Sequence, residues 1–328
     1  MNKMRINLTV CIIIALSMIL CPAAALTGDL TGGTRQTVAV KTDETENGGY
    51  ISVMSSSTGK TEKIELREYI IGCVAAEMPA NYHTEALKAQ AVASYTYAKK
   101  VGEQNEKYKE SYLGEADITD SPETHQGYID ESDRRKKWGD DFGEYEKKIS
   151  DAVDEVFGYF MTYDGETVLA VYHSNSAGKT QSARTLWGTD IPYLVSVESP
   201  GDKLSPDYVT THEFTKNEFR KIAKKCDISL DGDAEEWTGE LKKDESGYVV
   251  SVKLGATEFS AAKFREEFGL KSCCFDIEYD DDKFTVTCFG NGHGAGMSQY
   301  GADYMARQGS TWREILKHYY TDIEFDAE

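Results

Sequence analysis

The chain has 328 residues, of which 40% are hydrophobic and 28% charged, so it is long enough for one large or two ordinary globular domains and too apolar to be disordered. Its 36 basic and 56 acidic residues give a net charge of −20. Nucleic-acid binding needs a basic surface against phosphate, so we expect no nucleic-acid partner. A neutral or polar sugar substrate is compatible with this charge.

Residues 1–26 have the order of a secretory signal. Lys3 and Arg5 precede an apolar run at Val10–Leu20, and small residues follow at Ala23–Ala25. The apolar core is short for a membrane span, so the segment is either a cleaved signal peptide or a retained membrane anchor. In both cases we expect an exported, extracytoplasmic protein.

The next part of the chain is predicted to form a linker and two helices. Residues 27–60 are rich in Thr, Gly, Ser and Glu and predict a linker with a short strand near Tyr50–Met54. From Ile64 the apolar residues recur at spacings of three and four, which predicts a helix that Pro79 ends. A second helix is predicted over Thr84–Val101.

Polar residues 102–150 predict an exposed lobe, which leads into a helix at Tyr145–Val156. Two strands are predicted on either side of the hairpin-turn signal Asp164-Gly165. A mixture of helices and short, mainly antiparallel strands follows without an internal repeat, which predicts an α+β fold. The elements expected here are the strands Phe160–Tyr163 and Val168–His173, the helix Lys216–Cys226, the strands Tyr248–Leu254, Phe275–Tyr279 and Phe284–Phe289, and the helices Met297–Gln308 and Trp312–Tyr319, the last with Ser310 as N-cap.

The cysteines outside the export segment contain no CxxC spacing, so neither a zinc knuckle nor a thioredoxin-type motif is predicted. A Cys274–Cys288 bridge across a hairpin and small buried core cysteines are both compatible with the pattern. The set is odd in number, so at least one thiol stays unpaired: Cys73, Cys226, Cys273, Cys274 and Cys288.

Glu77 is a lone carboxylate between Ala76 and Met78, at the end of the first predicted helix. Burial disfavours the charged form of an acid, and the negative end of the helix dipole acts in the same direction. We therefore expect a raised pKa for Glu77 and a role as a general acid near neutral pH. The alternative is a solvated glutamate at a helix end.

Four glycines at every second position, from Gly290 to Gly296, surround His293. Their spacing fits neither a GxGxxG motif nor a P-loop, and it predicts positive φ angles or a close backbone approach. The sequence GMSQYG that follows is close to a nucleophile elbow, with its second glycine one position late. A serine hydrolase built on Ser298, His293 and Asp303 is therefore one alternative.

Two further groups contain residue types that could bind a sugar or a metal ion. Tyr172-His173-Ser174 ends a predicted strand and enters a loop of small residues, and such polar and aromatic side chains suit a sugar ring. His125, with Asp117 and Asp120, has the ligand types of a metal site, although such residues in a polar loop are more often solvated.

Together, the blocks AEMPANYHTEALKAQAVASYTYA and GHGAGMSQYGADYMARQGSTWREILKHYY resemble the stage II sporulation protein D family. Three intervening blocks resemble the same family in unbroken order: YHSNSAGKTQSA, LWGTDIPYLVSVESP and KLGATEFSAAKFREEFGLKS. The resemblance begins at about Ile64, so residues 61–328 are identified as a SpoIID-type catalytic domain.

The resemblance implies a lytic transglycosylase that cleaves peptidoglycan glycan strands stripped of their stem peptides, to 1,6-anhydromuramyl products. It also implies membrane-bound wall-hydrolase partners, which act with it while a mother cell engulfs a forespore. Glu77 corresponds to the catalytic acid of the family. The residues implied to bind substrate are Lys88, Gln90, Tyr172, His173, Ser174, His293, Gln299 and Tyr300.

The sequence departs from the family at two places. Members often carry Arg-Thr-Tyr where this chain has Tyr95-Thr96-Tyr97, so a positive charge expected near the site is missing. Some members hold zinc through Cys and His in a stretch that reads DITDSPETHQGY here. This stretch keeps His125 and has no cysteine, so we expect no metal cofactor.

A lytic transglycosylase can work with one carboxylate, which protonates the glycosidic oxygen and then takes the proton of the muramic C6 hydroxyl as that hydroxyl attacks the anomeric carbon. A hydrolase usually needs a second carboxylate, and the motif around Glu77 shows one candidate only. The alternative from a different class is a non-catalytic glycan-binding protein that activates a cell-wall amidase.

Overall fold

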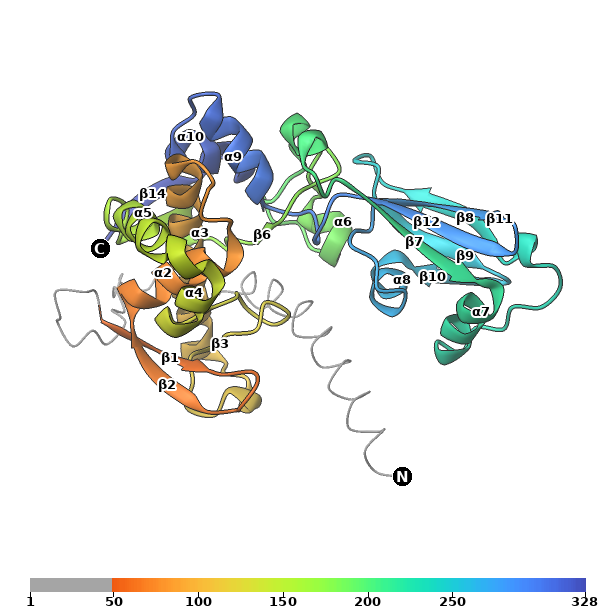
Figure 1. Ribbon diagram of the computed structural model, residues 1–328, viewed down its shortest axis with the longest axis horizontal. Coiled ribbons are helices and arrows are strands. Elements are labelled where there is room, and N and C mark those ends of the chain that lie inside the picture. Colours follow the sequence, from red (N-terminus) through yellow and green to blue (C-terminus); the bar gives the residue numbers. More distant parts are fainter. Residues whose placement is uncertain (1–48) are drawn as a thin grey trace, which may run out of the picture. The chain divides into compact units, whose positions relative to one another are not determined.

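The computed structural model describes residues 49–328, which form two units (Figure 1). In the described part of the chain the first unit contains residues 49–171 and 306–328, and the second contains residues 172–305. The second unit is therefore an insertion in the chain of the first. The predicted export segment 1–26 and most of the linker 27–60 lie outside the described residues. Among residues 49–328, no helix combines the length and apolar character that a bilayer span requires.

Helices form the centre of the first unit (Figure 1). α2 (Leu66–Glu77), α3 (Thr84–Lys107) and α5 (Phe142–Asp154) pack against one another, and α10 (Trp312–Tyr319) packs on α3. The three-and-four spacing of their apolar residues gives each helix a buried side, so the predicted helices are confirmed. α3 continues to Lys107, beyond the predicted end at Val101. The prediction stops early because the last turns of the helix are polar and carry no apolar pattern. Shorter helices complete the lobe: η1 (Ser111–Leu113), α4 (Glu131–Trp138) and η2 (Gly139–Asp141).

Two small sheets flank these helices. β1 (Tyr50–Met54), a predicted strand, pairs antiparallel with β2 (Thr61–Glu65) and parallel with β3 (Ile118–Thr119). β4 (Tyr159–Tyr163) pairs antiparallel with β5 (Glu166–Thr167) and with β14 (Glu324–Ala327). Asp164 and Gly165 have φ angles of 50° and 77°, which confirms the predicted hairpin turn.

The second unit is built on two three-stranded antiparallel sheets. β7 (Val209–Thr215), β12 (Lys283–Phe289) and β11 (Phe275–Asp280) form one, and β8 (Thr238–Lys243), β9 (Val249–Leu254) and β10 (Thr257–Ser260) form the other. Aromatic rings fill the core between them; the rings of Phe219 and Phe284 stack with centroids 4.0 Å apart. The remaining helices of this unit are α6 (Ala183–Trp187), η3 (Pro200–Leu204), α7 (Lys216–Lys225), η4 (Ala234–Glu236) and α8 (Ala261–Glu267).

The prediction of one strand over Val168–His173 is wrong for most of its length. Within this range only Tyr172–His173 forms a strand, β6, which pairs in parallel with β13 (Met297–Ser298). Because Met297 and Ser298 are extended, the helix expected from Met297 begins two residues later, as α9 (Gln299–Arg307).

The predicted N-cap of α10, Ser310, is also wrong. Thr311 caps the helix: its hydroxyl accepts from the N–H of Glu314 at 3.4 Å, and the Glu314 carboxylate accepts from the N–H of Thr311 at 2.8 Å. This reciprocal pair is a capping box, which needs Thr and Glu three positions apart. Thr311 satisfies that spacing and Ser310 does not.

Helices and short, mostly antiparallel strands are mixed along the described chain, which confirms the α+β class. The cysteines within residues 49–328 are free thiols, so a Cys274–Cys288 bridge is not formed. Cys288 pairs with Phe275, and Cys274 immediately precedes that strand and continues its pairing through the Cys274 carbonyl, which accepts from the N–H of Phe289 at 2.8 Å. Successive side chains of a strand point to opposite faces, so Cys274 and Cys288 lie on opposite sides of the sheet.

Candidate functional site

Glu77 is the last residue of α2. The helix ends there because Met78, which precedes Pro79, takes an extended conformation with φ −115° and ψ 146°. The Glu77 side chain is half-buried, and its Oε1 accepts a hydrogen bond of 2.6 Å from the backbone N–H of Gly127. The carboxylate is thus held by a loop that is distant in sequence.

The loop that carries Gly127 is fixed to the helices by its two neighbours. The buried amide of Gln126 donates to the Tyr69 hydroxyl at 3.0 Å and to a backbone carbonyl of α3 at 3.2 Å. The ring of Tyr128 stacks on Tyr69 at a centroid distance of 5.4 Å. It also lies over Gly72, where a Cβ atom would fall 2.3 Å from the ring, so a glycine in α2 is what allows this contact.

A cation approaches the same end of α2 from α4. The Lys137 Nζ donates to the carbonyl of Ala75 at 2.7 Å. Burial lowers the pKa of Lys137, while the charge of Glu77 acts to raise it, so the two side chains interact electrostatically. The resemblance implies that a positive charge is missing at Tyr95; Lys137 supplies a positive charge near Glu77 from a different element.

Lys88 and Gln90 lie on α3 and have other partners. The Lys88 Nζ pairs with Glu85 at 2.8 Å and with Glu155, and its side chain is 12% exposed. Burial lowers the pKa of Lys88, but its two carboxylate partners raise it by more. Gln90 is fully buried and donates to the Ser94 hydroxyl at 3.1 Å. None of these contacts involves Glu77.

His293 lies in the glycine-rich loop of the second unit. Its Nε2 donates to the Tyr172 carbonyl at 2.9 Å, and its Nδ1 accepts from the N–H of Ala295 at 3.2 Å. A carbonyl can only accept, so the proton of the neutral ring is on Nε2. Burial lowers the pKa of His293 to about 4.

His173 is the second histidine of this loop region, with its ring centroid 5.6 Å from that of His293. It is buried, and its Nδ1 donates to the Ala295 carbonyl at 3.0 Å. Burial, and secondly the charge of His293, lower the pKa of His173 to about 3. The ring is therefore neutral near pH 7, and its buried Nε2 is an acceptor with no protein partner among residues 49–328.

The backbone of the glycine-rich loop lies very close to neighbouring residues, as the spacing of its glycines predicts. Gly292 has a φ of 115°, and a Cβ there would lie 2.7 Å from the Cβ of His173. Gly294 has a φ of 83°, and a Cβ there would lie 2.7 Å from the Tyr248 hydroxyl. Both positions therefore require glycine for conformation and for space.

Ser298 is engaged in a different network from that of a catalytic serine. Its hydroxyl donates to Asp202 at 2.7 Å and accepts from the N–H of Gly301 at 3.0 Å. The Asp202 carboxylate is fully buried and also binds Ser176. The serine hydrolase alternative requires a hydroxyl that donates to a histidine base, and this hydroxyl donates to an aspartate instead.

The remaining predicted residues of the second unit lie beside β6. The N–H of Tyr300 donates to the Ser174 carbonyl at 3.0 Å, and its hydroxyl donates to the Leu204 carbonyl at 2.9 Å. Gln299 is buried at the start of α9. The second unit thus brings Tyr172, His173, Ser174, His293 and Tyr300 together through direct contacts.

The side chains of the metal-site alternative bind separate backbone groups. Asp117 and Asp120 accept from N–H groups of β1 and of the residues after it, at 2.9 and 2.7 Å. The Nδ1 of His125 accepts from the N–H of Thr119 at 3.3 Å, and burial lowers the pKa of His125 to about 4. Residues 49–328 contain no group of three or more His, Cys, Asp or Glu placed to hold a metal ion. The two aspartates fasten the loop to β1 and the residues after it, and His125 binds β3, so as a donor set these side chains do not fit zinc.

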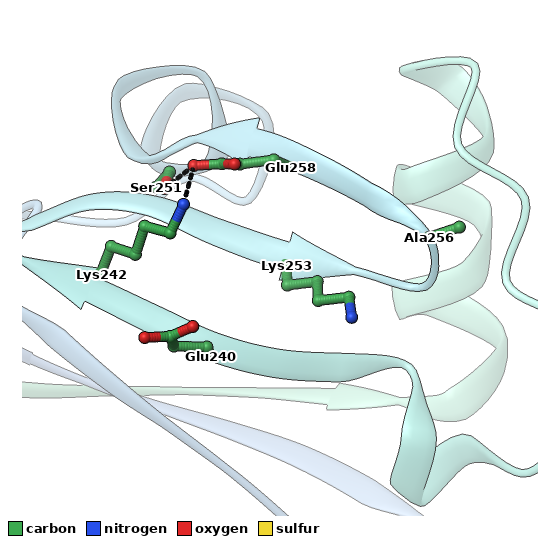
Figure 2. Close-up of a pocket in the computed structure, with 6 residues that line it drawn as sticks. All are labelled: Glu240, Lys242, Ser251, Lys253, Ala256 and Glu258. Carbon is green, nitrogen blue, oxygen red and sulfur yellow. Dashed lines mark hydrogen bonds and ion pairs between the residues drawn. The ribbon is translucent and has the colours of Figure 1, made fainter.

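A shallow pocket on the β8–β9–β10 sheet contains none of the predicted residues (Figure 2). Its charges are mixed in sign: the Lys242 Nζ pairs with Glu258 at 2.8 Å, and Ser251 donates to the same carboxylate at 2.7 Å. It is lined by Glu240, Lys242, Ser251, Lys253, Ala256 and Glu258.

Gly127 and Lys137 are partners of Glu77 that sequence reasoning does not identify. Gly127 lies in the HQGY stretch, whose residue types indicate only a candidate metal ligand. Lys137 ends a short basic run in the predicted exposed lobe. Neither stretch shows in sequence that it returns to α2.

Residues 54–163, which include Glu77, Gly127 and Lys137, match the family model described as SpoIID, stage II sporulation protein. The chain is 36% identical over 275 residues to stage II sporulation protein D of Bacillus amyloliquefaciens, covering 84% of this chain and 78% of that protein. It is 37% identical over 271 residues to the Bacillus subtilis protein of the same name, covering 82% and 77%. It is 25% identical over 305 residues to the amidase enhancer of Bacillus subtilis, covering 76% of this chain and 39% of that protein.

Proposed function

Because the chain belongs to the stage II sporulation protein D family, a family that gives it a role in sporulation, we propose that it is a lytic transglycosylase acting on denuded peptidoglycan glycan strands. Glu77 is its catalytic acid in this proposal. The observation that carries the assignment is the held carboxylate: Glu77 ends a buried helix and its Oε1 is fixed by Gly127 at 2.6 Å. A general acid needs such a fixed direction toward its substrate.

The reaction uses one carboxyl group twice. Protonated Glu77 gives its proton to the glycosidic oxygen as the bond from that oxygen to the anomeric carbon breaks. The ionised carboxylate then takes the proton of the muramic C6 hydroxyl, whose oxygen bonds to the anomeric carbon and closes the 1,6-anhydro ring. Glu77 ends protonated, no water is consumed, and no second carboxylate is required.

Four acids on or beside α2, α3 and α5 support a single-carboxylate route. Glu85 on α3 and Glu155 after α5 both pair with the Lys88 ammonium. Glu68 on α2 and Glu146 on α5 both pair with Arg134. Carboxylates committed to such ion pairs are poor candidates for the water-activating base that a hydrolase would need.

Replacing Glu77 by glutamine tests the proposal. The amide of the Glu77→Gln variant keeps an oxygen that can accept the N–H of Gly127 but has no proton to give at neutral pH, so the fold persists and cleavage falls by about 10³-fold or more. The measurement is mass spectrometry of the products released from purified denuded strands. Glu62→Gln, on the exposed strand β2, is the control and keeps the wild-type rate. Anhydromuramyl release by Glu77→Gln at the wild-type rate would contradict the assignment.

The proposal includes the setting of the reaction. Residues 1–26 direct the protein out of the cytoplasm, where it works with other membrane-bound sporulation wall hydrolases on the same glycan strands. Fractionation of sporulating cells checks this, since an intact full-length protein found only in the cytoplasmic fraction would contradict it.

The second candidate function is a glycan-binding activator of a cell-wall amidase. The observation that favours it is the 25% identity to a protein named amidase enhancer, which spans 76% of this chain. An activator would bind strands and raise the rate of an added amidase without releasing anhydro products. The same product analysis therefore separates the two candidates.

A further inference from the structure

The backbone N–H of Gly127 touches the carboxyl group that the proposed function makes catalytic. We propose that Gly127 is a positioning residue: its N–H determines which oxygen of Glu77 carries and delivers the proton. The role in catalysis rests on the proposed function, whereas the contact between the two residues can be measured without any activity.

The chemistry of the hydrogen bond assigns the two oxygens. The Gly127 N–H can only donate, and Oε1 accepts from it at 2.6 Å. In a protonated carboxyl group one oxygen is a hydroxyl that donates and the other is a carbonyl that accepts. The bond therefore favours the form with the proton on Oε2. Once Glu77 has given up that proton, the same N–H stabilises the carboxylate, because bonds to ionised acceptors are the stronger ones.

Glycine at position 127 is explained by the space beside the carboxyl. A Cβ atom there would lie 2.9 Å from Oε1 and 3.3 Å from the Cβ of Ala76. Gly127 does not have a left-handed φ, so an alanine would meet no backbone strain at this position. Its effect would therefore come from crowding against the Glu77 carboxyl and the Ala76 side chain and not from backbone strain.

The donor is held in place before any substrate binds. Gln126 is hydrogen bonded to Tyr69 and to α3, and Tyr128 is stacked on Tyr69 over Gly72. Both neighbours of Gly127 are thus fixed to the helix that ends at Glu77. A donor that is already oriented needs no reorganisation during the reaction, and such preorganisation is the usual source of strong catalytic hydrogen bonds.

Gly127→Ala tests the inference, with Gly143→Ala as the matched control. Gly143 is on α5, has no left-handed φ, and has no atom within 4 Å of an added Cβ. We expect Gly127→Ala to lower kcat on denuded strands by about 10- to 100-fold with KM unchanged. Displacing a catalytic group by up to about 1 Å has effects of this order. Gly143→Ala keeps both constants. An unchanged kcat for Gly127→Ala overturns the inference.

A double-mutant cycle with Glu77→Ala measures the contact without reference to activity. Gly127→Ala lowers the midpoint of thermal unfolding in the wild-type background, and lowers it less when Glu77→Ala has removed the atom that the new Cβ meets. Additive shifts overturn the inference even for an inactive protein. A wild-type protein that releases no anhydro product contradicts the proposed function alone, and a non-additive cycle would still show that position 127 lies against this carboxyl.

Discussion

At the end of α2, two polar groups act on one carboxyl. The Gly127 N–H contacts Oε1, and the Lys137 ammonium binds the Ala75 carbonyl and interacts with Glu77. The buried thiol of Cys73, on α2, also senses the charge of Glu77; burial keeps the pKa of this thiol well above the ordinary value, so it stays neutral. Lys137 is therefore a group whose charge bears on the protonation of Glu77.

Removing that charge should shift the pH dependence of the reaction. A nearby cation favours the ionised form of an acid, so Lys137→Met favours protonated Glu77 and moves the alkaline limb of the pH–rate profile upward, by up to about one pH unit. Lys137→Arg keeps the charge and the wild-type profile. The measurement is kcat against pH for the three proteins; a limb that moves to lower pH in Lys137→Met would contradict the argument.

For single residues, the sequence pattern selects Glu77 but does not identify the residues that contact it. Apolar neighbours and a following proline distinguish Glu77 from other glutamates within a few residues of chain. Gly127 and Lys137 reach it only because a loop and a helix fold back onto α2. Such contacts depend on tertiary packing, and no local pattern encodes them.

Among the elements, α4 is held in place by one buried cation. The Arg134 side chain is 1% exposed and pairs with Glu68 of α2 at 2.7 Å and with Glu146 of α5 at 2.9 Å. A charged arginine is seldom buried to this degree unless it is paired on more than one side. Arg134 therefore connects the helix that carries Lys137 to the two helices around it.

Arg134→Met should reduce the free energy of unfolding by about 3 kcal/mol. This loss is near the lower end of the range for breaking a buried ion pair, because both carboxylates keep some access to solvent. The neighbouring Arg135, 59% exposed and paired with Glu131 on its own helix, is the control. Arg135→Met should cost less than about 0.5 kcal/mol. Urea unfolding of both variants tests this, and equal losses would contradict it.

Helices and strands are predicted correctly where their buried side gives the sequence a regular spacing of apolar residues. The long helices α2 and α3 and the half-buried strand β12 carry that period, and their predicted bounds lie within a few residues of the observed ones, apart from the polar end of α3. The sequence does not predict β8, because most of its residues are exposed and it has no apolar alternation. It predicts helix for the extended pair Met297–Ser298, because the pairing of these residues with β6 involves a segment far away in sequence.

On the scale of the whole molecule, the described chain divides into two units at a position without a sequence signal. The boundary falls between Val171 and Tyr172, within the segment predicted to form one strand. No proline-rich or glycine-rich linker separates the units there. Sequence composition can indicate a linker, but an insertion that leaves directly from packed structure has no such composition.

Buried His173 in the second unit and half-buried His125 in the first are both neutral near pH 7, which should make the fold sensitive to acid. The pKa of His173 is about 3 in the second unit, and that of His125 is about 4 in the first, against about 6.5 when unfolded. The unfolded chain therefore binds more protons below pH 6.5, so the free energy of unfolding falls as the pH falls through this window. His173 alone accounts for a loss of about 2 kcal/mol between pH 6.5 and pH 5.

Unfolding experiments at several pH values check this sign. His173→Asn keeps an N–H donor for the Ala295 carbonyl and removes the titration, so stability should depend less steeply on pH between 5 and 6.5. A variant as steep as the wild type would contradict the assignment of the effect to His173.

The pairing of β14 with β4 has a consequence for how the molecule is made. Thr162 lies opposite Glu324, so these two strands meet across the entire insertion. A ribosome must synthesise all of residues 172–305 before it supplies the strand that completes this sheet and the helix α10 that packs on α3. Contacts between such distant segments form slowly, and the unit that bears Glu77 can be completed only after the insertion has been translated, although its helices α2 to α5 are translated first.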